Sequence, residues 1–128
     1  MTIISKDTSN FGGIFRDRDE PNRIEILWRD NQRIDGRRTQ QHNSGASNDF
    51  KGAETNVLNT DERYDISFSF DGSICRFFLN GNQFLEVDCS SGFKGMITDP
   101  HLCYSNWGNG WNGLIENVRF DGSQDKGI

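Results

Sequence analysis

The chain has 128 residues, a formal net charge of −5 and an isoelectric point of about 4.9. This length suits one domain, residues 1–128, with a core of its own. An acidic chain without a basic stripe lacks the footprint that phosphate neutralisation needs, so we expect no nucleic-acid partner. No stretch has the length of a membrane-spanning helix or the pattern of a signal peptide, so we expect no membrane insertion.

The composition predicts an all-β fold. Only 33% of the residues are hydrophobic, but ten Phe and three Trp can each bury a large area. The 14 glycines and frequent Asn-Gly and Asp-Gly pairs fit many short strands joined by tight turns. No helical periodicity extends over ten residues, which favours strands throughout the chain.

The N-terminal segment begins directly with a strand pattern. Residues 2–4 read TII after Met1, and residues 12–16 read GGIFR as a second strand. If residues 2–4 form a free sheet edge, that edge invites a homo-oligomer by strand addition. Residues 17–22 are predicted to form a turn, because Pro21 excludes a helix.

The next segment alternates apolar and charged residues. Between residues 23 and 29, Ile24, Ile26 and Trp28 form the predicted core face. Residues 52–58 could form a further strand.

Residues 35–52 are polar, with Phe50 as the single large apolar side chain. We interpret them as a long surface loop or a polar edge strand. The alternative is a polar groove that is lined by four side chains, namely Arg37, Arg38, Gln41 and His42.

The first hairpin is predicted from strict alternation over residues 64–70, followed by Asp71-Gly72. A two-residue turn there fixes three pairs of opposite residues: Phe70 with Ser73, Phe68 with Cys75, and Ile66 with Phe77.

The second hairpin has two candidate registers. A two-residue loop at Asn80-Gly81 would put Glu86 on the core face. A three-residue loop, residues 80–82, keeps apolar with apolar and opposite charges together, so we predict that register. It pairs Phe77 with Leu85, Cys75 with Val87, Arg76 with Glu86, and Phe78 with Phe84.

The hairpin sequence RYDISFSFDGSICRFFLNGNQFLEV resembles the central meander of laminin-G-like domains and their concanavalin A-like lectin and glucanase relatives. The segment WNGLIENVRFDG resembles the closing strand of that superfamily, and TIISKD, GGIFRD and RIEILWRDNQRI resemble its earlier strands. The resemblance implies an antiparallel β-sandwich of jelly-roll type. Relatives carry a strand or two before the first segment, so the chain is expected to lack the first strands or to be a piece of a longer protein.

Three cysteines, Cys75, Cys89 and Cys103, cannot all pair within the chain. We predict buried or half-buried thiols and leave a Cys89–Cys103 disulfide open. His42 and His101 stand apart and no CxxC spacing occurs, so we expect no zinc site.

Catalysis has weak support in the sequence. Glycoside hydrolases of this architecture carry carboxylates at alternate positions of one strand, which places an acid and a nucleophile about 5 Å apart. Glu86-Val87-Asp88 approaches that pattern, and residues 17–20 carry further acidic side chains. Ordinary surface charge is the preferred interpretation of both, and we predict that the chain is not an enzyme.

Calcium is a second question for the acidic turns, because hard oxygen ligands suit that ion. Asp17, Asp19 and Asn22 could supply three ligands, as could Asp99 with Asn106. Neither spacing matches a defined calcium loop, so a solvated turn is preferred and no cofactor is predicted as certain.

Residues 99–112 are the best candidate for a binding site. Two tryptophans lie four residues apart among Gly and Asn, a composition that suits sugar rings and hydroxyl groups. We predict that Trp107 stacks on a sugar ring with Tyr104 nearby. The other predicted ligand-binding residues are Trp111, Asn106, Asn109 and Asn112. The alternative for Trp111 is a structural plug in the sandwich.

The predicted function is therefore non-catalytic carbohydrate binding, with a carbohydrate or glycoprotein as partner and with an extracellular, cell-surface or virion location. A structural or protein-interaction domain of a larger surface, adhesin or virion protein is the first alternative. A truncated relative of glycoside hydrolases is the second.

Overall fold

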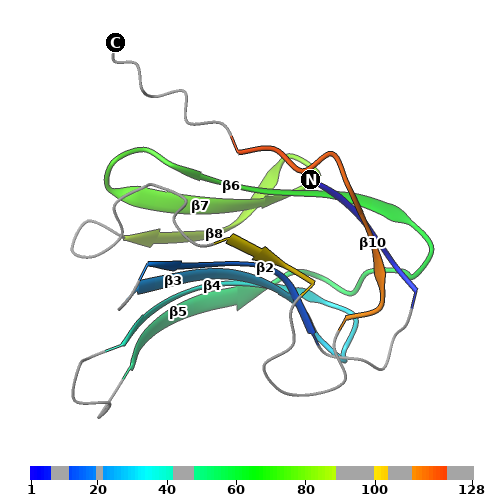
Figure 1. Cartoon of the computed structure of the whole chain (residues 1–128), viewed down its shortest axis with the longest axis horizontal. Coiled ribbons are helices and arrows are strands. Elements are labelled where there is room, and N and C mark those ends of the chain that lie inside the picture. The colour runs from blue at the N-terminus through cyan, green and yellow to red at the C-terminus, as the bar shows by residue number, and fades with distance from the viewer. Residues whose placement is uncertain (7–11, 20–21, 42–47, 89–99, 104–110, 121–128) are drawn as a thin grey trace.

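The computed structural model describes residues 1–6, 12–19, 22–41, 48–88, 100–103 and 111–120. These residues form ten strands that are joined by turns and irregular segments (Figure 1). In chain order the strands are β1 (Thr2–Ser5), β2 (Gly12–Asp19), β3 (Asn22–Trp28), β4 (Ile34–Gln41), β5 (Asn48–Glu54), β6 (Arg63–Phe70), β7 (Ile74–Leu79), β8 (Asn82–Asp88), β9 (Pro100–Leu102) and β10 (Gly113–Glu116).

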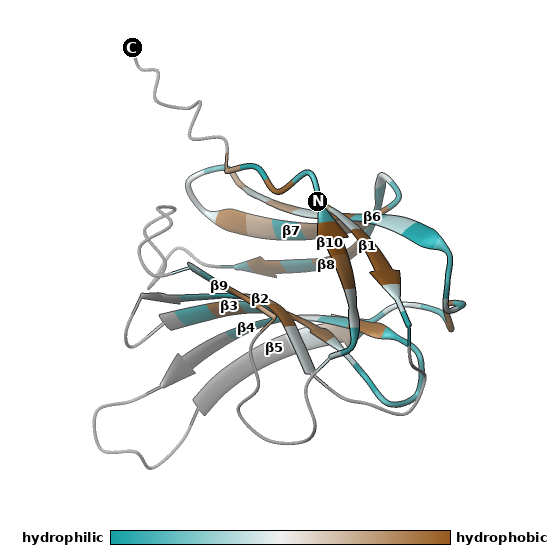
Figure 2. Cartoon of the chain, turned by 45° about the vertical axis from the view of Figure 1, so that its right-hand side comes forward, coloured by the Kyte–Doolittle hydropathy of each residue, from teal (hydrophilic) through white to brown (hydrophobic). Residues whose placement is uncertain are grey.

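The strands build two antiparallel sheets. The first has the order β10-β1-β6-β7-β8 and the second the order β5-β4-β3-β2-β9. The sheets lie face to face as two layers, which two views of the chain show (Figures 1 and 2). The prediction of an all-β jelly-roll sandwich is confirmed. In the described part of the chain, no helix is long and apolar enough to cross a membrane.

β1 lies inside the first sheet. It pairs with β10 on one side and with β6 on the other, and the N-terminal amine donates a hydrogen bond to the Ile66 carbonyl at 2.9 Å. The hypothesis of strand addition at this strand is wrong, because both of its ladders are already filled within the chain.

The polar segment after Ile34 forms a hairpin of β4 and β5, with β5 at the sheet edge. The polar edge strand is thus confirmed, and the strand expected at 52–58 ends at Glu54. Gly36 permits close packing here, since a Cβ at this position would lie 2.9 Å from the Phe77 ring and 3.2 Å from that of Phe84. The turn predicted from residue 17 is wrong, because β2 continues to Asp19 between its neighbours β3 and β9.

The first hairpin has a longer loop than predicted. Phe70 lies opposite Cys75, Phe68 lies opposite Phe77, and three residues, 71–73, connect β6 to β7. Asp71 explains the difference: its carboxylate accepts hydrogen bonds from the backbone N–H groups of Ser73 and Ile74 at 3.0 and 2.9 Å. The predicted register is wrong by two residues, which leaves every side chain on its predicted face.

The second hairpin combines both candidate loops. Phe77–Leu85, Cys75–Val87 and Arg76–Glu86 pair as predicted, but Phe78 lies opposite Gln83 rather than Phe84. Asn80 and Gly81 have φ of 49° and 80°, as in a two-residue type I′ turn. A bulge beside Phe78 then adds the residue that restores the predicted pairing farther along the strands.

The core lies between the sheets. Ile24, Ile26 and Trp28 are fully buried there, as predicted. Cys75 is buried, as predicted, whereas Cys103 is exposed. Cys89 lies outside the described residues, so a disulfide with it stays untested.

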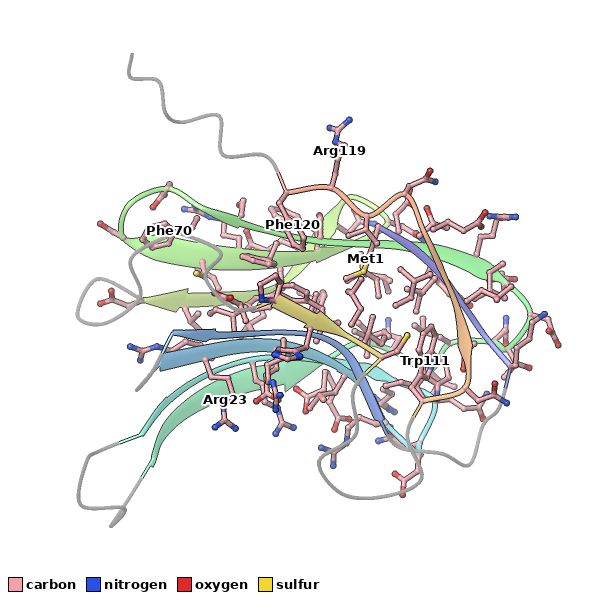
Figure 3. The ribbon with its side chains drawn as sticks, viewed as in Figure 1. Met1, Arg23, Phe70, Trp111, Arg119 and Phe120 are labelled. Atoms are coloured by element: carbon pink, nitrogen blue, oxygen red, sulfur yellow. The ribbon has the colours of Figure 1, made fainter. Side chains whose placement is uncertain are left out.

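The strand that closes the first sheet is shorter than expected. β10 covers only Gly113–Glu116, and Asn117 then takes a φ of 57° that turns the chain out of the strand. Phe120 turns back toward the second sheet, and its ring lies 5.8 Å from the Phe15 ring, centroid to centroid (Figure 3).

Trp111 lies in the core and is 8% exposed. Its indole N–H donates a hydrogen bond to the Ser5 hydroxyl at 3.2 Å. A Cβ on Gly113 would collide with the Trp111 ring, with Cη2 at 2.7 Å, and with the Ile4 carbonyl oxygen. Glycine at 113 is therefore what lets the Trp111 ring pack against β1.

We expect Gly113→Ala to lower the free energy of unfolding by about 2–3 kcal/mol, because an overpacked core must shift backbone or ring. Urea unfolding measures the loss. Gly72→Ala is the control, since its Cβ meets open space and only its positive φ of 104° adds strain, about 1 kcal/mol. Equal losses in the two variants would contradict the packing role of Gly113.

The hairpin carboxylate gives a pH prediction. The Arg76 guanidinium, followed by the N–H groups of Ile74 and Ser73, lowers the pKa of Asp71 to about 2 from 3.8. A lowered pKa contributes stability that is present above pH 4 and lost as the pH falls toward 2. We expect Asp71→Asn to lower the melting temperature more at pH 5 than at pH 2. Glu86→Gln removes the other carboxylate beside Arg76 and is the control. Its melting temperature should still fall between pH 5 and pH 2, as in the wild type.

Candidate functional site

The outward face of the second sheet carries a row of charged side chains. Because Ile24, Ile26 and Trp28 point into the core, the alternate residues of β3 lie on the opposite face. Glu25 lies opposite Arg16 of β2 and Arg37 of β4, and Arg16 lies opposite His101 of β9. The row Arg37, Glu25, Arg16 and His101 thus crosses four strands, with Gly52 of β5 beyond Arg37.

Further charges flank this row on the same face. Arg23 lies on one side of it and points away from the sandwich (Figure 3). Asp35 lies on the other side, opposite Leu27 and Glu54. We call this surface the arginine face, and it comprises Arg16, Arg23, Glu25, Leu27, Arg29, Asp35, Arg37, Glu54 and His101.

The centre of the arginine face is buried although it points away from the core. Arg16 is 8% exposed, Glu25 is 6% exposed and Asp35 is 4% exposed. Arg23 and Arg37 are half-buried, and His101 is exposed. A ligand therefore meets Arg23, Arg37 and His101 first.

Ion pairs hold the half of the face around Asp35. The Arg37 guanidinium donates a hydrogen bond to the Asp35 carboxylate, and Arg29 Nη1 approaches the same oxygen at 3.4 Å. Arg29 Nε also lies 3.8 Å from Glu54. Burial raises the pKa of Asp35 above 3.8, and the hydrogen bond and charge of Arg37 and the charge of Arg29 act in the opposite direction.

Two charged residues lie on the inner face instead. Asp17 and Arg38 flank Ile24 in the strand register and are 0% and 2% exposed. Successive residues of a strand point to opposite faces, so Arg38 cannot line a groove together with Arg37. The groove suggested for these two side chains is wrong in this respect. The Gln41 side chain and His42 lie outside the described part.

The predicted site residues lie mostly outside the described residues. Tyr104, Asn106, Trp107 and Asn109 belong to that undescribed segment, and their role stays a prediction. Asn112 is exposed.

Trp111 packs in the core, as the structural alternative expected. A stacking role for its ring would require the side chain to leave the core. The segment that holds the other predicted residues follows β9 in the sequence.

The two carboxylates weighed for catalysis lie elsewhere. Glu86 and Asp88 are exposed on β8, at the edge of the first sheet, and Glu86 lies 3.3 Å from Arg76 Nε. Asp17, considered as a calcium ligand, is buried on the core side. The side chains of Asp19 and Asn22, and residues Asp99 and Asn106, are outside the described part. Among the residues the structure describes, no group of three or more His, Cys, Asp or Glu side chains could hold a metal.

Sequence reasoning missed Arg16, Glu25 and His101 as site residues. The alternation in residues 23–29 already indicates that Glu25 faces away from the core. Its neighbour Arg16 lies 9 residues earlier in the sequence, and His101, which lies opposite Arg16, follows Arg16 by 85 residues. No local pattern indicates either pairing.

We expect Arg37→Met to lower the free energy of unfolding by about 1–3 kcal/mol at pH 7, because it leaves the buried Asp35 carboxylate without its main partner. Because the pKa of the Asp35 carboxyl is raised in the folded state, that group lowers stability as the pH rises above its ordinary pKa of 3.8. Removal of Arg37 raises this pKa further, so the loss of stability grows with pH. Urea unfolding should thus show a smaller loss near pH 4 than at pH 7. The double variant with Asp35→Asn is the control and should recover part of the loss at pH 7. No recovery would contradict the Arg37–Asp35 coupling.

Known proteins resemble this chain in structure rather than in sequence. No family model and no curated protein matches it. A GH16 protein of the Bacteroides ovatus mixed linkage glucan PUL, in complex with a G4G4G3G product, is similar with a TM-score of 0.58 and 17% identity over 77% of this chain. A glycoside hydrolase family 16 endo-glucanase from Bacteroides ovatus, in complex with G4G3G-2F-DNP, is similar with a TM-score of 0.56 and 13% identity over 77% of this chain.

The chain spans 49% of the length of each of these solved structures. At this level of identity the likeness concerns the fold. The two sheets and this likeness show that the chain has an antiparallel jelly-roll sandwich similar to the fold of these two structures.

Proposed function

We propose that the chain is a non-catalytic carbohydrate-binding module and that the arginine face is its binding surface. The observation that carries the proposal is the row of Arg37, Glu25, Arg16 and His101 on the outward face of one sheet. The glucan-derived ligands of the two structural neighbours support a carbohydrate as the ligand. An extracellular, cell-surface or virion location belongs to this proposal.

The chemistry of the row suits sugar hydroxyl groups. Guanidinium groups donate several hydrogen bonds in a fixed plane, and a carboxylate such as Glu25 accepts them. All four side chains project from strands, so little order is lost on binding. Trp107, in the segment after β9, would add a ring for stacking, and Tyr104, Asn106, Asn109 and Asn112 would add polar contacts.

The sequence of β3 supports a non-catalytic role. A retaining glycosidase needs two carboxyl groups about 5 Å apart on one face. Consecutive outward positions of β3 hold Arg23, Glu25 and Leu27, which supply one carboxylate.

A hydrolase is the second candidate, and one observation favours it. Glu25 and Asp35 are diagonal neighbours across β3 and β4, on the same face. Burial raises the pKa of Asp35, the direction expected of a general acid. Its ion pair with Arg37 opposes that role, and we place it second for this reason.

A glycan array, with and without calcium, tests the binding proposal. We expect a hit for the wild type that weakens about tenfold in Arg23→Gln, because a charged hydrogen bond is lost. Trp107→Ala should weaken the same hit if the segment after β9 completes the site. Arg119→Gln is the matched control, since Arg119 lies on the far side of the molecule (Figure 3).

Absence of any hit would favour a structural or protein-interaction module instead. Release of reducing sugar from mixed-linkage glucan, abolished in Asp35→Asn and in Glu25→Gln, would support the hydrolase and contradict the non-catalytic role. If Glu86→Gln alone abolished that activity, the site would lie on β8.

A further inference from the structure

The arginine face differs from the rest of this acidic chain in its balance of charge. The chain as a whole has a net charge of −5. On the arginine face, four arginines stand against three carboxylates, and His101 lies at the end of the row. The arginines are Arg16, Arg23, Arg29 and Arg37, and the carboxylates are Glu25, Asp35 and Glu54.

The depth of the charges matters more than their number. The Asp35 side chain is 6% exposed, while those of its partners Arg37 and Arg29 are 15% and 33% exposed. Glu25 is likewise buried, and Arg23 beside it is half-buried. Two of the three carboxylates, Asp35 and Glu25, are thus buried, while Glu54 exposes 35% of its side chain beside Arg29. Away from Glu54, an approaching ligand meets the guanidinium groups of Arg23 and Arg37.

The two arginines that form ion pairs on the first sheet have exposed carboxylate partners. Arg76 exposes 31% of its side chain, and its partners Asp71 and Glu86 expose 50% and 51%. Arg63 exposes 64% of its side chain, and its partner Glu116 exposes 46%. An anion that approaches either of these arginines therefore also meets an exposed carboxylate.

We infer that the arginine face takes acidic oligosaccharides, whose rings carry uronate carboxylates or sulfate esters, in preference to neutral glucans. This inference rests on the proposed carbohydrate binding. A guanidinium group matches the two oxygens of a carboxylate or sulfate in a planar, bidentate geometry. The buried Asp35 carboxylate holds Arg37 and Arg29 in place, and its side chain is less exposed than theirs.

The preference for acidic over neutral sugars is tested with three polymers that share one polysaccharide backbone: laminarin, carboxymethylated laminarin and sulfated laminarin. Titration calorimetry should show at least tenfold tighter binding of one or both charged polymers than of laminarin, and this preference should shrink as salt rises. Which charged polymer binds separates the carboxylate from the sulfate, and either result supports the inference.

Variants connect the preference to the face. Arg23→Gln should weaken charged-polymer binding about tenfold, and Arg23→Lys should weaken it less because the charge remains without the planar fork. Arg119→Gln, the same change on the far side, should bind like the wild type. Circular dichroism of Arg23→Gln checks that the fold persists.

Three outcomes would overturn the inference. Equal binding of laminarin and its charged forms, unchanged by Arg23→Gln, would remove the acidic preference and leave carbohydrate binding intact. Competition by polyglutamate at the same charge concentration would show recognition of charge without a sugar. No binding to the three polymers or to any glycan of the array would overturn the proposed function and this inference together.

Discussion

A chain of phenylalanine rings across the space between the sheets fixes the rest of the structure. Centroid distances of 5.6 to 6.3 Å connect the rings, in the order Phe120, Phe15, Phe68, Phe77 and Phe84. Four of them come from four strands, and these strands belong to both sheets. Once Phe15 faces inward on β2, Arg16 must face outward, and the same alternation on β3 sends Glu25 outward beside Ile24 and Ile26. The packing that stabilises the sandwich therefore also positions the arginine face.

The parts of the fold that sequence reasoning predicted are those where an apolar residue recurs at every second position. Residues 23–29 and 64–70 have that period, and their core faces are as predicted. The loop at Asp71 was predicted too short, because side-chain hydrogen bonds to the backbone selected a three-residue connection over the two-residue turn that Asp-Gly suggests. The alternation of inward and outward residues was still predicted correctly, because a shift of two residues leaves each side chain on the same face of the sheet. The β4–β5 hairpin could not be recognised as surely, because its residues 35–52 contain one large apolar side chain.

The arginine face was harder to predict for a different reason. Its members lie on four strands, and nothing between Arg16 and His101 in the sequence indicates that these two will pair. The buried charges obscure the pattern further. Arg37 and Arg38 are chemically identical neighbours, yet one is turned to the outside and the other lies with Asp17 on the core side. Only the strand register in the structure shows which of the two arginines can contact a ligand and which is buried on the core side.

Arg37 also decides between recognition and catalysis on this face. A general acid must hold its proton at the working pH, and burial moves the pKa of Asp35 in that direction. The Arg37 guanidinium opposes the shift by a hydrogen bond and by its charge, and Arg29 adds a second positive charge. An aspartate held between two arginines orients them more readily than it donates a proton. Because orientation of guanidinium groups is what binding an anion or a sugar requires, the same ion pairs that weaken the case for a hydrolase strengthen the case for a binding surface.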